Sequence, residues 1–309
     1  MFIHRFCSMI VLLALFSLML LNNCAGLIAY LVFGILLSFF VTKEICEIFG
    51  NIQSHTDKIF LCMANTLIFI LFYLIMFTKE HPQWRVYSSL TEQCIFLLLV
   101  ILFVAGLIRI LRSVNDEEKL KKIVMNTFVF VFVNFPVCLI TLIYFAFRSD
   151  YGCLHEHFHS FLNAGFLYFI LVTKSGDIGA YAIGTLCGKL MKNGTHKMIP
   201  SVSPGKSYEG LAGGILTSVA LSCILCSVFE IRALSDHWVL PVLGGLVLYF
   251  GGMIGDLVES SIKRTCKVKD SGRLIPGIGG VYDLLDSLFF SAPCYLLFLA
   301  AVNLVRNIL

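Results

Sequence analysis

Residues 238–264 read WVLPVLGGLVLYFGGMIGDLVESSIKR, and this stretch decides the fold. Residues 238–255 carry no charged side chain, and they are followed at once by Asp256, Lys263 and Arg264. The hydrocarbon core of a bilayer is crossed by a helix of roughly 20 apolar residues. The stretch therefore predicts a membrane-spanning helix that continues into a charged turn.

The composition of the whole chain agrees with a membrane protein. The chain has 309 residues, of which 58% are hydrophobic and 14% are charged. Soluble domains carry about a quarter charged residues, so most of this chain is expected to lie in lipid. The net charge of +4 is small and dispersed, and we expect no nucleic-acid partner.

Apolar runs predict nine spans, at residues 6–22, 25–42, 59–78, 93–111, 124–147, 160–173, 210–229, 238–255 and 285–305. The segment 177–191 is rich in small residues and is interpreted as a broken or re-entrant helix. The fold class is thus an all-α polytopic membrane protein with about nine transmembrane helices. Residues 1–150 are predicted to form N-terminal transmembrane helices, and residues 151–309 a C-terminal catalytic transmembrane region.

The loops differ in their content of lysine and arginine. With the N-terminus in the cytoplasm, 18 of these residues lie on the inside and 5 on the outside. Because basic residues accumulate on the cytoplasmic side, this bias predicts a cytoplasmic N-terminus and an outside C-terminus. We therefore expect a multi-pass protein of the inner, or cytoplasmic, membrane, with a polar active site facing the cytoplasm.

Two segments of the C-terminal half place charged groups where apolar spans end, and such groups usually mark a functional site. Lys174 and Asp177 follow the sixth span in a stretch of small residues. Ser203, Lys206 and Ser207 lie on what we interpret as a tight loop that enters a helix. Backbone N–H groups at a helix start, together with a lysine, suit an anionic phosphate.

The strongest cluster comes from two helices. Asp256, Ser260 and Lys263 share one face of the first helix. Asp283 and Asp286 share one face of the second. Carboxylates from two helices can clamp a hard divalent cation, and Mg²⁺ prefers carboxylate and phosphate oxygens. The sequence therefore predicts Mg²⁺, as one ion or two, held by Asp256, Asp283 and Asp286.

Basic residues and glycines accompany these carboxylates. The basic side chains would neutralise a nucleotide triphosphate, and they are Lys263, Arg264, Lys267 and Lys269. The glycines would let the backbone approach phosphates closely, and they are Gly277, Gly279 and Gly280.

The order of these residues resembles the signature of the phosphatidate cytidylyltransferases, also called CDP-diacylglycerol synthases. That signature reads Ser-x-apolar-Lys-Arg, four residues, Lys-Asp, then Pro-Gly-His-Gly-Gly and Asp-Arg-x-Asp. The residues in register are Ser260, Ile262, Lys263, Arg264, Lys269, Asp270, Pro276, Gly277, Gly279, Gly280, Asp283 and Asp286. Residues 203–210 are similar to the family's Ser-Pro-Lys-Lys-Thr-x-Glu-Gly, and Asp177 with Ala180 and Tyr181 matches a further segment. The ordered match covers roughly 174–293.

The chain departs from the family pattern at three positions. Ile278 stands where the family has His, Leu284 where it has Arg, and Gly205 where it has the first lysine of a pair. Both carboxylates that flank Leu284 remain, so the chain is interpreted as a divergent, active member.

The resemblance implies transfer of CMP from CTP to phosphatidate, which gives CDP-diacylglycerol and pyrophosphate for phospholipid synthesis. It implies a nucleotidyltransferase with catalytic residues Asp256, Asp283, Lys263 and Ser260. The residues expected to bind substrate are Asp177, Ser203, Lys206, Arg264, Lys269, Asp270, Gly279 and Gly280. CTP, phosphatidate and the lipid bilayer are the expected partners, and a homodimer is left open.

Two alternatives stay open. A CTP-dependent polyprenol or phytol kinase also spans the membrane, but it transfers the γ-phosphate and releases CDP. A transporter is the non-enzyme alternative, because charges within the membrane also line ion paths. A transporter would not need the linked Lys-Asp and Gly-Gly spacing, and we find no inverted repeat in the sequence.

Overall fold

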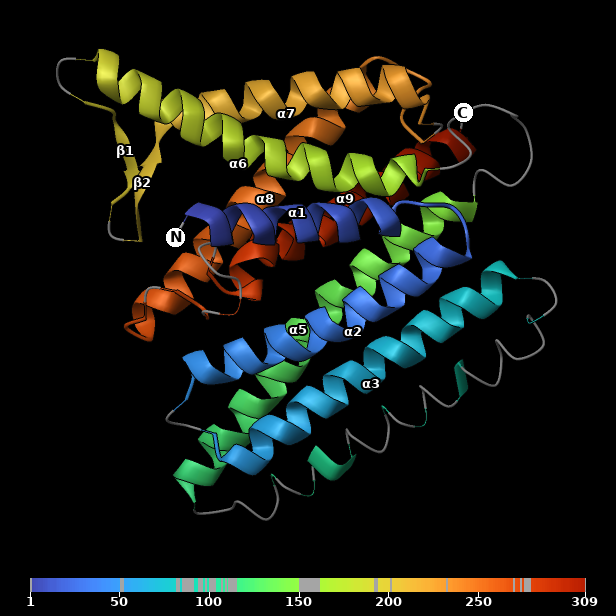
Figure 1. Cartoon of the computed structure of the whole chain (residues 1–309), viewed down its shortest axis with the longest axis vertical. Helices are drawn as coiled ribbons and strands as arrows, with labels where there is room; N and C mark the ends of the chain where they lie inside the picture. The colour runs from blue at the N-terminus through green and yellow to red at the C-terminus, as the bar shows by residue number, and fades with distance from the viewer. Residues whose placement is uncertain are drawn as a thin grey trace. The chain divides into compact units, whose positions relative to one another are not determined.

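The structure is a computed structural model. It describes residues 2–50, 53–81, 116–149, 162–191, 194–200, 202–231, 233–268, 270–272 and 279–308, with isolated residues between 84 and 110 and at 274. Its elements, labelled in Figure 1, are α1 (Phe2–Met19), α2 (Cys24–Ile48), α3 (His55–Glu80), α5 (Glu117–Ser149), α6 (Ala164–Leu190), β1 (Lys197–Ile199), β2 (Ser203–Ser207), α7 (Tyr208–Phe229), α8 (Val239–Thr265) and α9 (Val281–Ile308).

Seven helices among the described residues are long and apolar enough to cross a membrane, namely α2, α3 and α5 to α9. The chain is therefore an all-α polytopic, integral membrane protein, and the predicted fold class is confirmed. α1 contributes a shorter apolar stretch, Ile10–Met19. The predicted span 93–111 falls largely outside the described residues, so the count of nine spans and the cytoplasmic side of the site stay predictions.

Helix α6 corrects the expectation for residues 177–191. It runs without a break from Ala164 to Leu190, so this segment is neither broken nor re-entrant. Its small residues serve close packing against α7 instead. A Cβ placed at Gly179 would overlap the side chain of Thr217, and one at Gly213 would lie 2.5 Å from Cβ of Ile183. Small residues at helix contacts are typical of membrane bundles, because they let the helix backbones approach each other closely.

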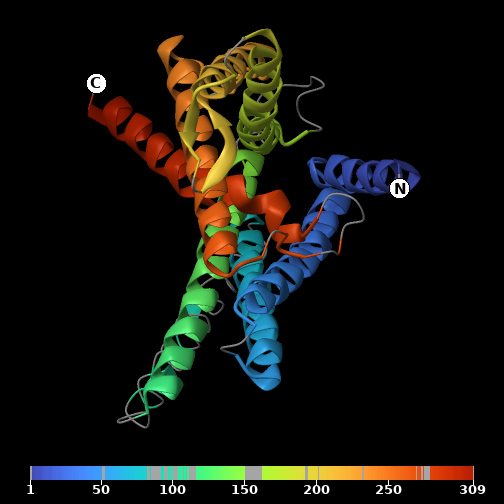
Figure 2. The same cartoon turned by 90° about the vertical axis from the view of Figure 1, so that its left-hand side faces the viewer.

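The chain divides into two compact units. Unit 1 comprises Met1–Phe145 and Asp270–Tyr282, and unit 2 comprises Ala146–Lys269 and Asp283–Leu309. Within unit 1, α2 and α3 lie side by side (Figure 2).

Buried amide and hydroxyl groups connect three helices of unit 1. Asn65 Nδ2 of α3 donates to Thr42 Oγ1 of α2 at 2.9 Å, and Asn134 Nδ2 of α5 donates to Asn65 Oδ1 at 2.6 Å. Thr42 and Asn65 have no exposed surface. Hydrogen bonds between helices stabilise membrane bundles, because a polar group left unpaired in hydrocarbon is costly.

In unit 2, α6 and α7 lie side by side and are joined by an antiparallel ribbon of β1 and β2 (Figure 1). Strand β2 occupies the place where the sequence indicated a tight loop. Ser207 ends the strand and caps α7, since its Oγ accepts a hydrogen bond from the N–H of Gly210 at 3.1 Å. Glu209 also accepts from the N–H of His196 at 3.2 Å, which ties the ribbon to the first turn of α7.

Glycines bring α8 into backbone contact with α9. A Cβ at Gly251 would lie 2.7 Å from Cα of Ser291, and a Cβ at Gly255 would overlap the carbonyl group of Asp286. Because Gly251 and Gly255 are one helical turn apart, they form a continuous small-residue stripe. The stripe brings the end of α8 against the first turns of α9.

Replacing Gly255 with alanine is expected to destabilise unit 2. The added methyl group meets backbone rather than a movable side chain, so we expect a loss of about 1–3 kcal/mol in the free energy of unfolding. Denaturant titration in mixed micelles measures this loss. Gly188→Ala on α6 is the matched control, because among the described residues its Cβ would meet only the side chain of Thr195, at 3.6 Å. Equal stability of the two variants would contradict this account of the α8–α9 contact.

Candidate active site

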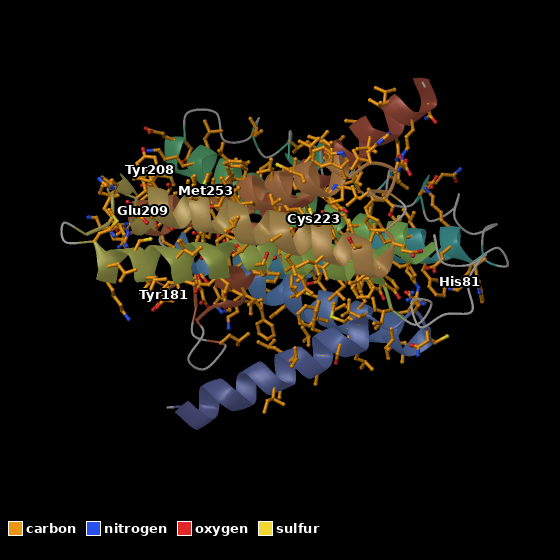
Figure 3. The ribbon with its side chains drawn as sticks, turned by 90° about the horizontal axis from the view of Figure 1, so that it is seen from above. His81, Tyr181, Tyr208, Glu209, Cys223 and Met253 are labelled. Carbon is orange, nitrogen blue, oxygen red and sulfur yellow. The ribbon has the colours of Figure 1, made fainter. Side chains whose placement is uncertain are left out.

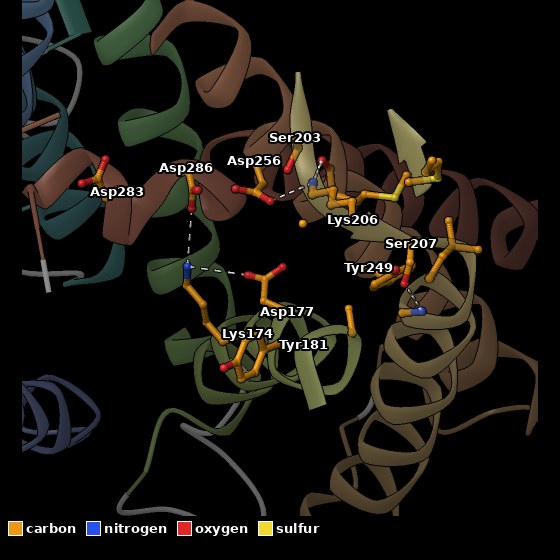
Figure 4. Close-up of a pocket in the computed structure, with 16 residues that line it drawn as sticks. Lys174, Asp177, Tyr181, Ser203, Lys206, Ser207, Tyr249, Asp256, Asp283 and Asp286 are labelled. Carbon is orange, nitrogen blue, oxygen red and sulfur yellow. Dashed lines mark hydrogen bonds and ion pairs between the residues drawn. The ribbon is translucent and has the colours of Figure 1, made fainter. Parts of the chain in front are cut away.

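Charged side chains of unit 2 meet in one cavity of about 340 Å³. It is lined from α6, the β ribbon, α7, α8 and α9 (Figure 4). The acidic residues in its wall are Asp177, Asp256, Asp283 and Asp286, and the lysines are Lys174 and Lys206. Figure 3 shows two other lining residues, Tyr181 and Met253, toward the same end of unit 2 as the start of α7, whereas Cys223 lies farther along that helix.

Lys174 connects α6 to α9. Its Nζ donates to Ser287 Oγ at 2.7 Å and lies 3.7 Å from Asp286 Oδ1. Asp177 stands one turn further along α6, with its Oδ2 at 4.0 Å from the same Nζ. The ammonium group of Lys174 therefore lies between two carboxylates, as the dashed lines in Figure 4 show.

Lys206 connects the β ribbon to α8. Its Nζ lies 2.7 Å from Asp256 Oδ2 and donates to the carbonyl oxygen of Met253 at 3.2 Å. The extended backbone of β2 carries this side chain into the cavity, while Ser203 lines the cavity from the start of the same strand. Lys206 is thus held by a strand and a capped helix start rather than by a free loop.

Three carboxylates on α8 and α9 gather at one point. Asp256, Glu259 and Asp286 have oxygens within 4.8 Å of one another. Glu259 is 2% exposed and Asp286 is 7% exposed. Like charges so close together and so far from water are unfavourable unless cations or a proton compensate them, and the lysines beside them supply part of that compensation. Clustered carboxylate oxygens are the ligands that Mg²⁺ takes, so the donor set fits this ion.

Asp283 has a different partner. Lys263 Nζ of α8 donates to Asp283 Oδ1 at 3.2 Å, and it lies 2.9 Å from Glu259 Oε1. Lys263 therefore joins the three-carboxylate group to Asp283. Asp283 lines the cavity, but the compact acidic group among the described residues contains Glu259 in its place.

The structure brings together most of the predicted site. The predicted residues that line the cavity are Asp177, Ser203, Lys206, Asp256, Asp283 and Asp286. Lys263 contacts one of them directly. Ser260 is half-buried on α8 and Arg264 is exposed, and neither lines the cavity. Their assigned roles stay predictions.

Three predicted binding residues belong to unit 1, and one lies beyond the described chain. Asp270, Gly279 and Gly280 fall in the segment of unit 1 that precedes α9. Lys269 lies outside the described residues, as does Ile278. Substrate contacts of these residues stay predictions.

The sequence placed Lys174 in a candidate cluster without a specific role, and it indicated no role for Glu259 or Tyr249. Glu259 stands three residues after Asp256, and Lys174 stands three before Asp177. Residues at this spacing share a helix face, so helical periodicity was a usable signal for both. Tyr249 lies in the middle of an apolar span and lines the cavity, and the sequence carried no signal for it.

Membrane-spanning helices around a cavity of lysines and carboxylates define an integral membrane protein with a charged site among its helices. Comparison with known proteins gives the particular family. The model of the Cytidylyltransferase family matches residues 3–302, and the chain belongs to this family. The predicted resemblance is thereby confirmed, and it extends into the N-terminal half, where the sequence alone indicated only apolar helices.

Individual relatives match the chain over shorter stretches. The uncharacterized protein YnbB of Escherichia coli (strain K12) is 40% identical over 133 residues, which are 43% of this chain and 41% of that protein. A phosphatidate cytidylyltransferase of Staphylococcus haemolyticus is 36% identical over 166 residues, 53% of this chain and 58% of the relative. One of Staphylococcus saprophyticus is 34% identical over 193 residues, 58% and 68% respectively. The chain thus spans about half the length of the first two of these relatives.

Removing one carboxylate of the buried group is expected to weaken binding of a divalent cation. Asp256→Asn keeps the size of the side chain but removes its charge, so the affinity for Mn²⁺, used as a spectroscopic substitute for Mg²⁺, should fall by about tenfold or more. Electron paramagnetic resonance titration of the purified protein measures it. Asp236→Asn is the control, because Asp236 pairs with Arg306 at 2.5 Å and does not line the cavity. Unchanged Mn²⁺ affinity in Asp256→Asn would contradict a cation site here.

Proposed function

We propose that this chain is a nucleotidyltransferase that transfers CMP from CTP to phosphatidate, giving CDP-diacylglycerol and pyrophosphate. One observation carries the proposal: the cavity of unit 2 is lined by residues from each of the sequence segments that resemble the phosphatidate cytidylyltransferases. Asp177 comes from the first segment, Lys206 from the second, and Asp256, Asp283 and Asp286 from the third. Membership of the Cytidylyltransferase family and relatives named phosphatidate cytidylyltransferase support it.

In the proposed reaction, a phosphate oxygen of phosphatidate attacks the α-phosphorus of CTP. A new P–O bond forms as the bond from that phosphorus to pyrophosphate breaks, and pyrophosphate leaves with the bonding electrons. Phosphatidate is already anionic, so the reaction needs no strong general base. It needs two polyanions to be aligned and their repulsion to be neutralised.

The lysines of the cavity meet this need. Lys206 projects from β2 and Lys174 from α6, so a triphosphate in the cavity would lie between cations from two elements. Lysine suits this purpose as a compact charge with rotatable donors. When phosphate oxygens replace Asp256 as the partner of Lys206, the carboxylate of Asp256 becomes available to a metal ion. Nucleotide and metal binding would then support each other.

The carboxylates would hold Mg²⁺. We propose Asp256, Asp283 and Asp286 as the ligands predicted from the sequence, with Glu259 as a further donor because it belongs to the buried acidic group. When bound, the ion supplies positive charge to the phosphate oxygens of the two substrates. Asp283 would exchange its contact with Lys263 for the ion, which leaves Lys263 beside the phosphates.

We propose that the cavity opens to the cytoplasm, where CTP is made, in the inner membrane of a bacterium. The excess of basic residues in the predicted inside loops supports this orientation, and the bacterial relatives support this membrane. The acyl chains of phosphatidate would stay in the bilayer while its headgroup enters the cavity.

The products of the purified protein test the reaction. With CTP labelled in the α-phosphate, phosphatidate and Mg²⁺, we expect labelled CDP-diacylglycerol together with pyrophosphate. Asp256→Asn and Asp283→Asn should each lower the rate by about a thousandfold or more, since each removes a proposed metal ligand. Asp236→Asn should keep the wild-type rate. Release of CDP with a newly phosphorylated lipid would contradict this proposal and would indicate a CTP-dependent lipid kinase instead.

Lys206 provides a second test, directed at nucleotide binding. Lys206→Met keeps an unbranched apolar stem and removes the charge, so KM for CTP should rise by roughly tenfold to a hundredfold, the range of a lost hydrogen bond to a charged group. Steady-state kinetics at saturating phosphatidate measure it. Lys197→Met is the control on the neighbouring strand, because Lys197 is exposed and does not line the cavity. An unaltered KM in Lys206→Met would remove Lys206 from the proposed CTP site.

A further inference from the structure

A buried carboxylate of unit 1 holds the start of α9. Glu44 lies in the last two turns of α2 and is 4% exposed. Its Oε1 accepts a hydrogen bond from the N–H of Val281 at 2.9 Å, and its Oε2 accepts from the N–H of Tyr282 at 2.8 Å. Ser271 Oγ donates to the same Oε2 at 3.2 Å. One side chain thus binds both ends of the segment Asp270–Tyr282.

Two glycines of this segment, Gly272 and Gly280, are packed on the same carboxylate. A Cβ at Gly272 would lie 2.7 Å from Cδ of Glu44, and one at Gly280 would lie 2.5 Å from Oε2. Gly279 adopts φ 128°, a conformation that other residues rarely take. At position 280 the absence of a side chain leaves room for the carboxylate of Glu44. This contact accounts for a glycine at that position without a bound phosphate.

The position of Glu44 suits the electrostatics of a helix start. The first N–H groups of a helix have no partner within the helix, and they carry partial positive charge. A buried carboxylate that accepts from two of them forms charge-assisted hydrogen bonds, which are among the stronger ones in proteins. Glutamine would keep the shape but replace one acceptor oxygen with an amide that faces a donor.

The chain passes from unit 1 to unit 2 inside α9, between Tyr282 and Asp283. Asp283 directly follows the residue that Glu44 binds, and Asp286 lies one turn later in the same helix. We propose that Glu44 is a positioning residue, which fixes the first turn of α9 and thereby the places of Asp283 and Asp286. The inference rests on the proposed function for its effect on catalysis, but its effect on structure and metal affinity does not.

Glu44→Gln tests the contact itself. Hydrogen–deuterium exchange resolves the amides of Val281 and Tyr282, and in Glu44→Gln both should exchange about tenfold faster or more than in the wild-type protein. Glu47→Gln is the matched control on the same helix. Glu47 is exposed and lies 3.9 Å from Lys43, so this variant should leave both amides unchanged.

Two further readouts separate positioning from a merely structural role. In Glu44→Gln the affinity for Mn²⁺ should fall by about tenfold or more, because Asp283 and Asp286 are displaced. The kcat for CDP-diacylglycerol should fall by a similar factor, while KM for CTP changes less, since Lys174 and Lys206 are untouched. Gly280→Ala, which pushes a methyl group against the Glu44 carboxylate, should reproduce the loss of Mn²⁺ affinity even if Glu44→Gln folds poorly.

The outcomes are distinguishable. Wild-type Mn²⁺ affinity in a folded Glu44→Gln, or in Gly280→Ala, would overturn the positioning role, and so would unchanged exchange at Val281 and Tyr282. A wild-type protein that makes no CDP-diacylglycerol would overturn the proposed function alone. Hydrogen–deuterium exchange and Mn²⁺ affinity would still test the positioning role of Glu44.

Discussion

The ion pairs between lysines and carboxylates inside unit 2 are the interaction on which its site depends. Each lysine comes from a different element: Lys174 from α6, Lys206 from β2 and Lys263 from α8. A carboxylate removed from water without a partner is strongly unfavourable, so each pair draws two elements together as well as balancing charge. The lysines of these pairs lie in or beside the cavity, so the arrangement that balances charge also places cations where the proposed function requires phosphates.

Such pairs form only if the helix backbones are close. Gly251 and Gly255 allow α8 to touch the backbone of α9, which brings Glu259 and Asp286 within the same small volume. Glycine lowers the propensity of a segment to form a helix. In a bilayer this is tolerated, because a single spanning segment can pair its backbone N–H and C=O groups only by forming a helix. The glycines of α8, which are unfavourable for a helix by propensity, therefore allow an acidic cluster to form between two helices.

The sequence predicted those features that depend on local periodicity. Apolar runs predicted the membrane class, and the spacing of Asp256, Lys263, Asp283 and Asp286 predicted that their side chains belong to one site. Features that depend on distant segments were not accessible in this way. Glu44 precedes its partner Tyr282 by 238 positions, and only the fold brings them together.

Two local interpretations were wrong or incomplete for physical reasons. The small residues of 177–191 suggested a broken helix, but they are the packing surface of α6 against α7, and tertiary contact overrides propensity. The segment 203–207 suggested a tight loop, yet it pairs with Lys197–Ile199 as a strand. A single sequence shows no partner for such a strand, because the bulged register with β1 leaves no regular alternation to read.

The residues of the family signature belong to both units of the structure and make different contacts. Gly280 of its glycine-rich portion belongs to unit 1 and is packed on Glu44, whereas Asp283 and Asp286 belong to unit 2 and line the cavity. Leu284 replaces the family's arginine between them, but the lysines that lie beside these two carboxylates come from other helices, α8 and α6. The loss of a cation at position 284 therefore leaves both pairs in place. A departure at that point is compatible with a charge-balanced site, because the balance is set by tertiary contacts rather than by neighbours in sequence.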